Sequence, residues 1–182
     1  MQKISAIILF SIYVTFMTLI LYNCVVVFTY PKKYETYINY VCDKFEISKP
    51  MFYALVDTES SFNPNAKSTA GAIGLTQILP TTAQYICTKN NLEYSNFDLY
   101  NPSDNLYIGA MYLDYLFDKF NNSYTSLCAY NAGETIVRSW LQDERYSYDK
   151  ISLYNTPYKE TNNYIKKIKK AEKIYIKFYK IK

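Results

Sequence analysis

The chain has 182 residues, 20 lysines and arginines, 16 aspartates and glutamates, and no histidine. The lack of histidine removes the commonest metal ligand and general base, and with them any Ser-His-Asp or Cys-His catalytic site. Only four glycines and six prolines, without internal repeats, favour a mainly helical fold. After an apolar N-terminal segment roughly 150 residues remain, which suits one domain with a real core.

The N-terminal segment predicts a membrane anchor. Residues 4–29 contain no charged side chain; a spanning helix needs about 20 apolar residues, against about 7 to 15 in a cleavable signal peptide. We therefore expect an uncleaved anchor at residues 1–30 and one domain at 31–182. The alternative is lipoprotein processing at Cys24, for which Asn23 is a poor fit. The flanking lysines leave the topology open.

Helical periodicity organises the rest of the chain. Apolar stripes and helix-start residues indicate helices at about residues 34–45, 50–60, from Pro80 onward, 102–120, 124–133, 134–141 and 160–179. Ser48 is expected to cap the second of these, with Pro50 in its first turn. Asn63-Pro64 is expected to end it. Gly71 and Gly74 mark an irregular segment after it, where tight turns or a close backbone approach are expected.

Three cysteines follow the anchor, and their pairing stays open. They are Cys42, Cys87 and Cys128, and no two of them are spaced as a CxxC pair, so a zinc site is not expected. One disulfide with one free thiol and three reduced core cysteines both fit the sequence.

Positive charge is concentrated at the C-terminal end. Residues 159–182 hold nine lysines and two glutamates, a net charge of +7, which leaves −3 for the remainder. The lysines form either a solvated helix face or a surface that attracts an anionic polymer or membrane. Nucleic acid is not an expected partner, because the anchor would hold the domain at a membrane.

The second predicted helix carries a glutamate on its apolar face. Phe52, Leu55, Val56 and Glu59 lie within roughly 80° of one another on a helical wheel. Burial of a carboxyl penalises its ionised form and raises its pKa toward the range where it donates a proton near neutrality. Asp57 points about 160° away and is not placed to assist. Glu59 is therefore either a proton donor or a helix-end carboxylate bonded to backbone amides.

Four motifs in order resemble the SLT-type lytic transglycosylases of the lysozyme-like superfamily. They are "ALVDTESSFNPNAKSTAGAIGLTQILPTTA", "YNPSDNLYIGAMYLDYL", "AYNAGETIVRSWL" and "PYKETNNYIKKI". The resemblance implies an α+β, predominantly α-helical, lysozyme-like fold that needs no cofactor or metal. It also implies peptidoglycan glycan strands as substrate and a domain on the periplasmic side of the cytoplasmic membrane, which residues 4–29 would span. Envelope or secretion-apparatus proteins are further expected partners.

In that family a single carboxyl acts as acid and base, and the resemblance assigns this role to Glu59. The acid would protonate the oxygen between N-acetylmuramic acid and N-acetylglucosamine. It would then take the proton of the muramoyl C6 hydroxyl, which attacks C1 and closes a 1,6-anhydro ring. The tethered hydroxyl has a high effective concentration, so no second carboxylate is required. The alternatives are a lysozyme-type hydrolase and a catalytically weak wall-binding module.

The resemblance carries further positions over one at a time. Ser68, Gly74 and Gln77 match substrate-cleft positions after the catalytic helix. Glu160 and Tyr164 match cleft-wall positions of the last motif. All five are expected to bind substrate.

The "AYNAG" motif supplies the remaining substrate-binding positions. Tyr130 matches a tyrosine near the catalytic carboxylate, which its hydroxyl is expected to orient or polarise, and Asn131 is expected to fix the loop that holds it. Ser60 is expected to support the helix end. Two residues depart from the family pattern: Thr76 stands in place of a methionine that contacts the cleft, and Cys128 in place of a small alanine.

Overall fold

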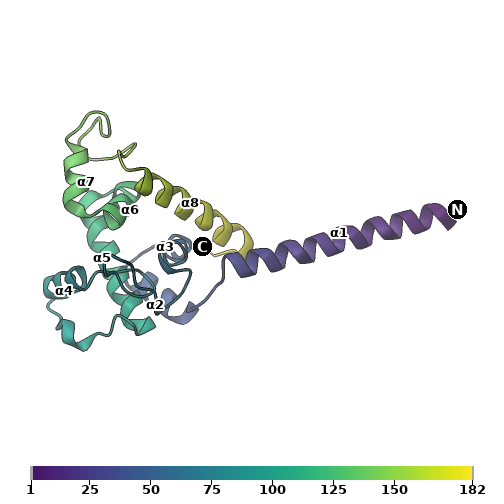
Figure 1. Ribbon diagram of the computed structural model, residues 1–182, viewed down its shortest axis with the longest axis horizontal. Helices are drawn as coiled ribbons and strands as arrows, with labels where there is room; N and C mark the ends of the chain where they lie inside the picture. Colours follow the sequence, from purple (N-terminus) through teal and green to yellow (C-terminus); the bar gives the residue numbers. More distant parts are fainter. Residues whose placement is uncertain (1, 182) are drawn as a thin grey trace. The chain divides into compact units, whose positions relative to one another are not determined.

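The computed structural model describes residues 2–181 and divides the chain into two compact units, Met1–Lys32 and Lys33–Lys182 (Figure 1). The first unit is dominated by helix α1 (Gln2–Thr29). Among the described residues, Ile7–Thr29 is the one stretch of helix long and apolar enough to cross a membrane by length and composition. Signal sequences meet the same criterion, so the expected anchor at residues 1–30 stays a prediction.

The second unit is built from helices, and the predominantly helical, lysozyme-like fold expected from the sequence is confirmed. Its elements are α2 (Glu35–Lys44), α3 (Lys49–Ser60), α4 (Pro80–Lys89), the 3₁₀ helix η1 (Tyr94–Asn96), α5 (Pro102–Phe120), α6 (Ser123–Ala132), α7 (Glu134–Leu141) and α8 (Lys159–Tyr179). In the described residues the β component is reduced to two isolated antiparallel bridges, Lys67 with Ile73 and Ile73 with Ile78.

Local sequence explains where α5 begins and ends. The side chain of Asn101 accepts hydrogen bonds from the backbone amides of Ser103 and Asp104, and Pro102 occupies the first turn. These residues satisfy amides that have no partner inside the helix. Asn121 adopts a left-handed conformation and ends the helix. The bounds predicted at residues 102–120 are confirmed.

The catalytic-helix candidate α3 differs in detail from the expectation. Ser48 precedes the helix, but its side chain makes no capping hydrogen bond, so the predicted cap is wrong. The helix ends at Ser60, because Ser61 already adopts a left-handed conformation with φ of 50°. The predicted end of the helix at residue 60 is confirmed, but Ser61 and not Asn63-Pro64 ends it, and Glu59 is the penultimate residue of α3.

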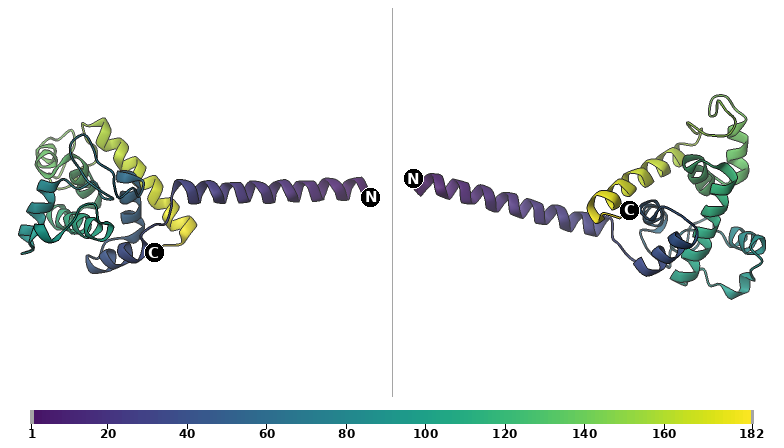
Figure 2. Two further views of the ribbon diagram at one scale, coloured as in Figure 1. Left: turned by 60° about the horizontal axis from the view of Figure 1, so that its bottom comes forward. Right: turned by 180° about the vertical axis from the view of Figure 1, so that it is seen from behind.

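Helix α3 packs along α8, and this pairing positions the site (Figures 1 and 2). Phe52, Tyr53 and Leu55 are fully buried on α3, and the ring of Tyr53 lies 5.2 Å from that of Tyr175 on α8. Burying Phe52 and Leu55 contributes roughly 1.5–3 kcal/mol each. The apolar contact therefore fixes which face of α8 meets the end of α3.

The three cysteines of the helical domain are free thiols in the structure. Cys42, Cys87 and Cys128 are each buried, and burial raises the pKa of Cys42 and of Cys128 to about 12. Thiols of this kind are inert because almost none of the reactive thiolate is present. Of the two alternatives that the sequence left open, the structure has reduced core cysteines.

Candidate functional site

Glu59 lies half-buried at the end of α3, in contact with a tyrosine of α8. The hydroxyl of Tyr164 donates a hydrogen bond to Glu59 Oε1 at 2.7 Å. Burial raises the pKa of Glu59 to about 7, although the bond from Tyr164 acts in the opposite direction by stabilising the carboxylate. A carboxyl with this pKa can both donate and accept a proton near neutrality.

The tyrosine bonded to Glu59 is not the one that the resemblance singled out. The hydroxyl of Tyr130 donates to the carbonyl oxygen of Thr76 at 2.9 Å. Tyr130 still lies near the acid, since the charge of Glu59 contributes to raising its pKa. The expected orienting hydrogen bond, however, comes from Tyr164, which is 7% exposed and which the resemblance assigns only to the cleft wall.

The segment beside the acid is held by side chains from three helices, which we call the loop clamp. The hydroxyl of Ser60 on α3 donates a hydrogen bond to the carbonyl oxygen of Leu75 at 2.8 Å. The side-chain amide of Asn105 on α5 donates to the carbonyl oxygen of Ile73 at 2.9 Å. The hydroxyl of Tyr130 on α6 donates to the carbonyl oxygen of Thr76 at 2.9 Å. Ser60 also bonds to its own helix at 3.2 Å, as expected. The clamp fixes an irregular backbone against Glu59.

Gly74 and Thr76 face α5 and do not line the cavity at Glu59. Gly74 has φ of +77°, and a Cβ there would collide with the Asn105 side chain and lie 2.5 Å from the carbonyl oxygen of Leu99. Thr76 is fully buried, and its hydroxyl donates to Asn105 Oδ1 at 2.8 Å. The structure thus gives Gly74 a packing role where a cleft-lining position was expected, and Thr76 is a buried residue with no cleft contact.

Two hollows border Glu59, and together we call them the cleft. The first, of about 430 Å³, which we call the loop lobe, is lined by Glu59, Ser68, Thr69, Ala70, Ala72, Gln77, Ile78, Leu79, Thr82, Tyr112, Tyr130, Asn131, Ala132, Gly133 and Glu160. The second, of about 570 Å³, which we call the α8 lobe, is lined by Thr58, Glu59, Asn131, Glu160, Asn163, Tyr164, Lys166 and Lys167. Glu59, Asn131 and Glu160 line both lobes, so the acid lies where the two lobes adjoin. All the predicted site residues except Gly74 are brought together here.

Two loop-lobe residues also build the turns that form its wall. The hydroxyl of Ser68 accepts a hydrogen bond from the amide of Ala72 at 2.9 Å. Gln77 has φ of 48°, and its side-chain amide donates to the carbonyls of Ala66 and Gly74 at 3.2 and 3.0 Å. A non-glycine residue in this region costs on the order of 1–3 kcal/mol and is concentrated at functional sites, which fits a position on the wall of the cleft.

The sequence did not single out several residues that the cleft contains. Tyr112 lines the loop lobe with its ring 5.2 Å from that of Tyr130, and its only signal was its place in "GAMYLDYL". Lys166 and Lys167 line the α8 lobe, although the sequence showed them only as members of a basic run. Asn105 is the member of the clamp that lies on α5, and its only signal was its place in "YNPSDNLYIGAMYLDYL".

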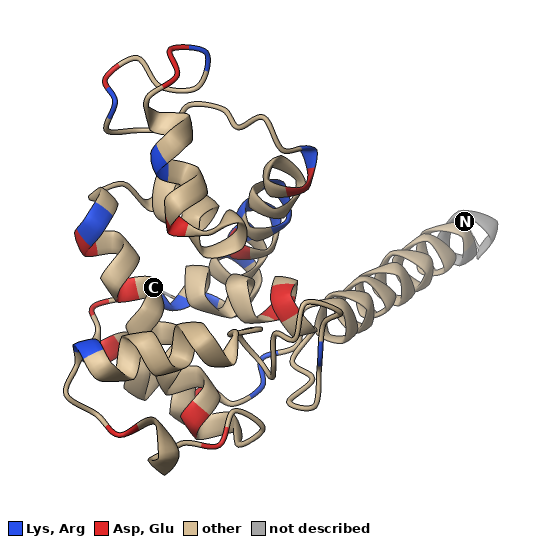
Figure 3. Ribbon diagram, turned by 60° about the vertical axis from the view of Figure 1, so that its left-hand side comes forward, with Lys and Arg blue, Asp and Glu red and all other residues tan. Residues whose placement is uncertain are grey.

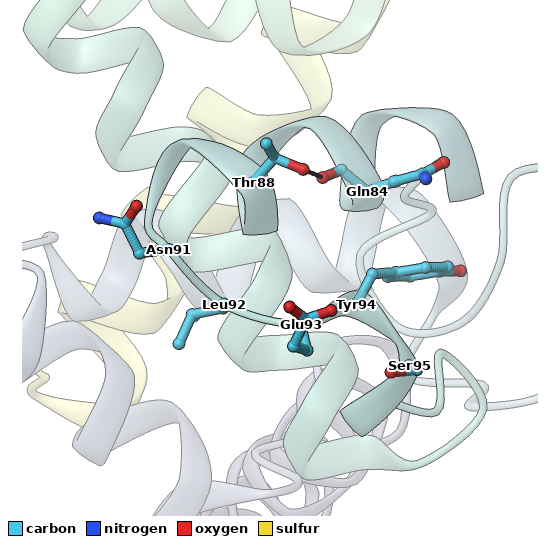
Figure 4. Close-up of a pocket in the computed structure, with 7 residues that line it drawn as sticks. All are labelled: Gln84, Thr88, Asn91, Leu92, Glu93, Tyr94 and Ser95. Carbon is cyan, nitrogen blue, oxygen red and sulfur yellow. Dashed lines mark hydrogen bonds between the residues drawn. The ribbon is translucent and has the colours of Figure 1, made fainter.

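Two further hollows share no residue with this cleft. One, of about 740 Å³, lies against α4 and the turn that follows it, and is lined by Gln84, Thr88, Asn91, Leu92, Glu93, Tyr94 and Ser95 (Figure 4). The other, of about 590 Å³, contains four aromatic residues among its nine and lies between α2 and the start of α5. Neither contains a residue that the sequence assigned to a site.

The chain is similar to proteins of known sequence and structure. It is 34% identical to the soluble lytic murein transglycosylase of Escherichia coli K12 over 143 residues, which cover 76% of this chain and 22% of that protein. It is also 34% identical to the Haemophilus influenzae counterpart over 142 residues, which cover 76% of this chain and 24% of that protein. It is 31% identical to the membrane-bound lytic murein transglycosylase C of Histophilus somni, over 79% of this chain and 46% of that protein. The chain therefore spans less than half of the curated relatives it matches.

Solved structures agree with these sequence matches. The 70 kDa soluble lytic transglycosylase of Escherichia coli superposes with a TM-score of 0.71 at 30% identity, over 82% of this chain and 25% of that one. The lytic transglycosylase Slt of Pseudomonas aeruginosa gives a TM-score of 0.73 at 26% identity, over 86% and 26%. Residues 36–153 match the family described as the Transglycosylase SLT domain. On sequence and on fold, the chain belongs to the family of transglycosylase SLT domains.

Proposed function

We propose that this protein is a peptidoglycan lytic transglycosylase with Glu59 as its single catalytic acid and base. The observation that carries the proposal is a half-buried carboxyl with a pKa of about 7, bonded to Tyr164 and open to a cleft. The relatives named as lytic murein transglycosylases support the same activity, and one of the similar structures is a complex with bulgecin A.

The proposed reaction uses one carboxyl twice. Glu59 donates its proton to the oxygen that joins N-acetylmuramic acid to N-acetylglucosamine, and the bond from that oxygen to the muramoyl C1 breaks. The muramoyl C6 hydroxyl then bonds to C1 and returns a proton to Glu59. The enzyme is restored, no water is consumed, and the product is a 1,6-anhydromuramoyl end. Tyr164 stabilises the carboxylate between the two proton transfers.

The cleft supplies the remaining parts of the proposal. Ser68 and Gln77 would contact the glycan strand in the loop lobe, which Tyr130 and Asn131 also line. Gly74 would act only by holding the loop. Tyr112 offers an aromatic ring of the kind that packs on sugar rings.

Glu160 provides the specific observation that favours a second candidate, a lysozyme-type hydrolase. It is the other carboxyl that lines both lobes with Glu59. A second carboxylate could activate a water molecule in place of the C6 hydroxyl. Against this, Glu160 is exposed to solvent at the first turn of α8.

Mass spectrometry of released muropeptides separates these candidates. The full chain in detergent is incubated with purified sacculi, and a transglycosylase gives anhydro ends that are lighter by one water than the reducing ends of a hydrolase. We expect anhydro products from the wild-type chain and from Glu160→Gln, and none from Glu59→Gln. Reducing ends that disappear in Glu160→Gln would establish hydrolysis, and a chain that releases nothing would be a wall-binding module.

We further propose that residues 1–30 anchor the protein in the cytoplasmic membrane, with residues 31–182 on the side of the cell wall. The apolar helix and the membrane-bound relative support this arrangement. Protease added to spheroplasts should digest the helical domain while a cytoplasmic marker stays intact. A domain that becomes accessible only after lysis would contradict the orientation, and a soluble, shortened chain would contradict the anchor.

A further inference from the structure

The α8 lobe joins the acid to the basic end of the chain. Glu160, Asn163 and Lys167 follow one another at helical spacing on one side of α8, with Lys166 beside them, and all four line the lobe. Tyr164, on the same helix, is bonded to Glu59. The helix therefore fixes the backbone positions of Lys166 and Lys167 relative to the reacting carboxyl.

The distances along the helix are short. With a rise of about 1.5 Å per residue, Lys167 lies about 4.5 Å along the axis from Tyr164, and Lys166 about 3 Å. The ammonium groups extend further on flexible four-carbon stems. Lys166 and Lys167 line the same lobe as Glu59, so a molecule that fills the lobe and reaches the acid also lies against both lysine side chains.

The two ammonium groups are open to such a partner. Both side chains are exposed, and the ion pairs within the described part of the chain involve Lys49, Arg138 and Arg145 but neither Lys166 nor Lys167. The acidic groups nearby are Glu160, which is exposed, and Glu59, which carries only part of a charge near neutrality because its pKa is about 7. The lobe has a net positive character that the proposed proton transfers do not use.

Figure 3 marks the lysines and arginines in blue. Lys170, Lys173 and Lys177 continue along α8 beyond the lobe and are all exposed. They line none of the hollows described above. Their presence supplies matched controls on the same helix, because removing them changes the overall charge equally without touching the lobe.

We propose that Lys166 and Lys167 bind a carboxylate of the peptide stem that the glycan strand carries on its muramoyl residues, so that the α8 lobe is a stem-peptide subsite. This rests on the proposed function, since peptidoglycan must lie across Glu59 for a stem to reach the lobe. A glycan backbone is uncharged, whereas the stems attached to it bear free carboxylates. The contact makes the protein discriminate between strands by the charge of their stems.

The first test is binding, which needs no turnover. Glu59→Gln in the full chain in detergent is titrated with three preparations of soluble strands: native stems, stems whose carboxylates are converted to methylamides, and strands stripped by an amidase, which leaves a carboxylate on each lactyl group. We expect native stems to bind roughly 3- to 10-fold more tightly than the methylamides, as two exposed charge pairs allow, and stripped strands to bind like the methylamides.

The lysine variants then locate the contact. In the same Glu59→Gln background, Lys166→Gln with Lys167→Gln should remove the preference and leave affinity for the methylamides unchanged, whereas Lys173→Gln with Lys177→Gln should keep the preference. Equal binding of native and methylamide strands overturns the proposal, as does a preference that survives loss of Lys166 and Lys167. Stripped strands that bind as tightly as native ones would assign the lysines to the lactyl carboxylate.

Cleavage by the chain with Glu59 intact keeps the two proposals apart. If all strands are cleaved at equal rates, the stem subsite fails and the transglycosylase stands. If nothing is cleaved but the stem preference in binding is present, the lobe stands and the proposed catalytic function fails.

Discussion

Replacing Glu59 by glutamine should make the protein more stable above neutral pH while it abolishes cleavage. The unfolded chain ionises this carboxyl near its ordinary pKa of 4.5, whereas the folded protein does so only at about 7. At every pH above 4.5 the raised pKa of the folded state therefore lowers the free energy of unfolding. Glutamine has a similar shape and keeps an oxygen that can accept the bond from Tyr164, but it never carries the charge.

The magnitude follows from the two pKa values. At 1.36 kcal/mol per pKa unit, the difference between 4.5 and about 7 corresponds to about 3 kcal/mol. This is an upper bound, because the half-buried carboxyl is partly screened by water in the cleft. Below pH 4.5 both states are protonated and the cost vanishes. It grows as the pH rises between the two pKa values and is constant above the higher one.

Thermal unfolding of the full chain, followed by circular dichroism at pH 4 and pH 8, tests this. For a domain of this size about 1 kcal/mol shifts the Tm by roughly 2–4 °C, so Glu59→Gln should melt up to about 10 °C higher at pH 8 and near the wild-type Tm at pH 4. A shift that is independent of pH, or a variant that is less stable at pH 8, would refute the reasoning.

Asp57→Asn is the matched control on the same helix. Burial raises the pKa of Asp57 from 3.8 to about 6, so this variant should also be stabilised at pH 8. Asp57 lines neither lobe of the cleft, and cleavage should therefore continue. Loss of activity in both variants would mean that stabilisation of α3, and not removal of the acid, stops the reaction.

Three further outcomes are expected. Tyr164→Phe removes the bond that lowers the pKa of Glu59, so the alkaline limb of the pH profile of kcat/KM should move to higher pH; an unchanged limb would show that the bond does not act on the free enzyme. Gly74→Ala should cost about 3 kcal/mol or more in urea unfolding, from backbone strain and overlap together. Gly71→Ala is the matched control, because Gly71 also has a positive φ of +88° but a Cβ there would meet nothing within 4 Å, so it should cost only the strain, about 1 kcal/mol. Equal losses would contradict the packing role of Gly74. Asn105→Ala leaves buried amide and carbonyl groups without partners and should cost about 3 kcal/mol, with a loss under 1 kcal/mol counting against the loop clamp.

The sequence predicts the helices well, because their signals are local. The bounds of α5 could be read from an Asn-Pro start and a periodic apolar face, and the spacing of Phe52, Leu55 and Glu59 placed the acid on the buried side of α3. The missing cap at Ser48 shows the limit of such signals, because tertiary packing alone can hold a helix start in place.

Hydrogen-bond partners in the site could not be read in the same way. Tyr164 and Glu59 are 105 residues apart, and their contact depends on how α8 packs on α3. Tyr130 reaches a carbonyl 54 residues away for the same reason. A motif places a tyrosine near a carboxyl, but only the packing of the helices decides which of two hydroxyls bonds to it.

The loop clamp has a consequence for hydrogen exchange. The amide of Thr76 donates to Asn105 Oδ1 at 2.8 Å, and the backbone around it is tied to α3, α5 and α6 at once. This amide cannot meet solvent unless contacts to several helices break together, so it should exchange only through near-global opening of the domain. The loop beside Glu59 would then open only when the domain unfolds, so it would not open locally to admit the glycan strand.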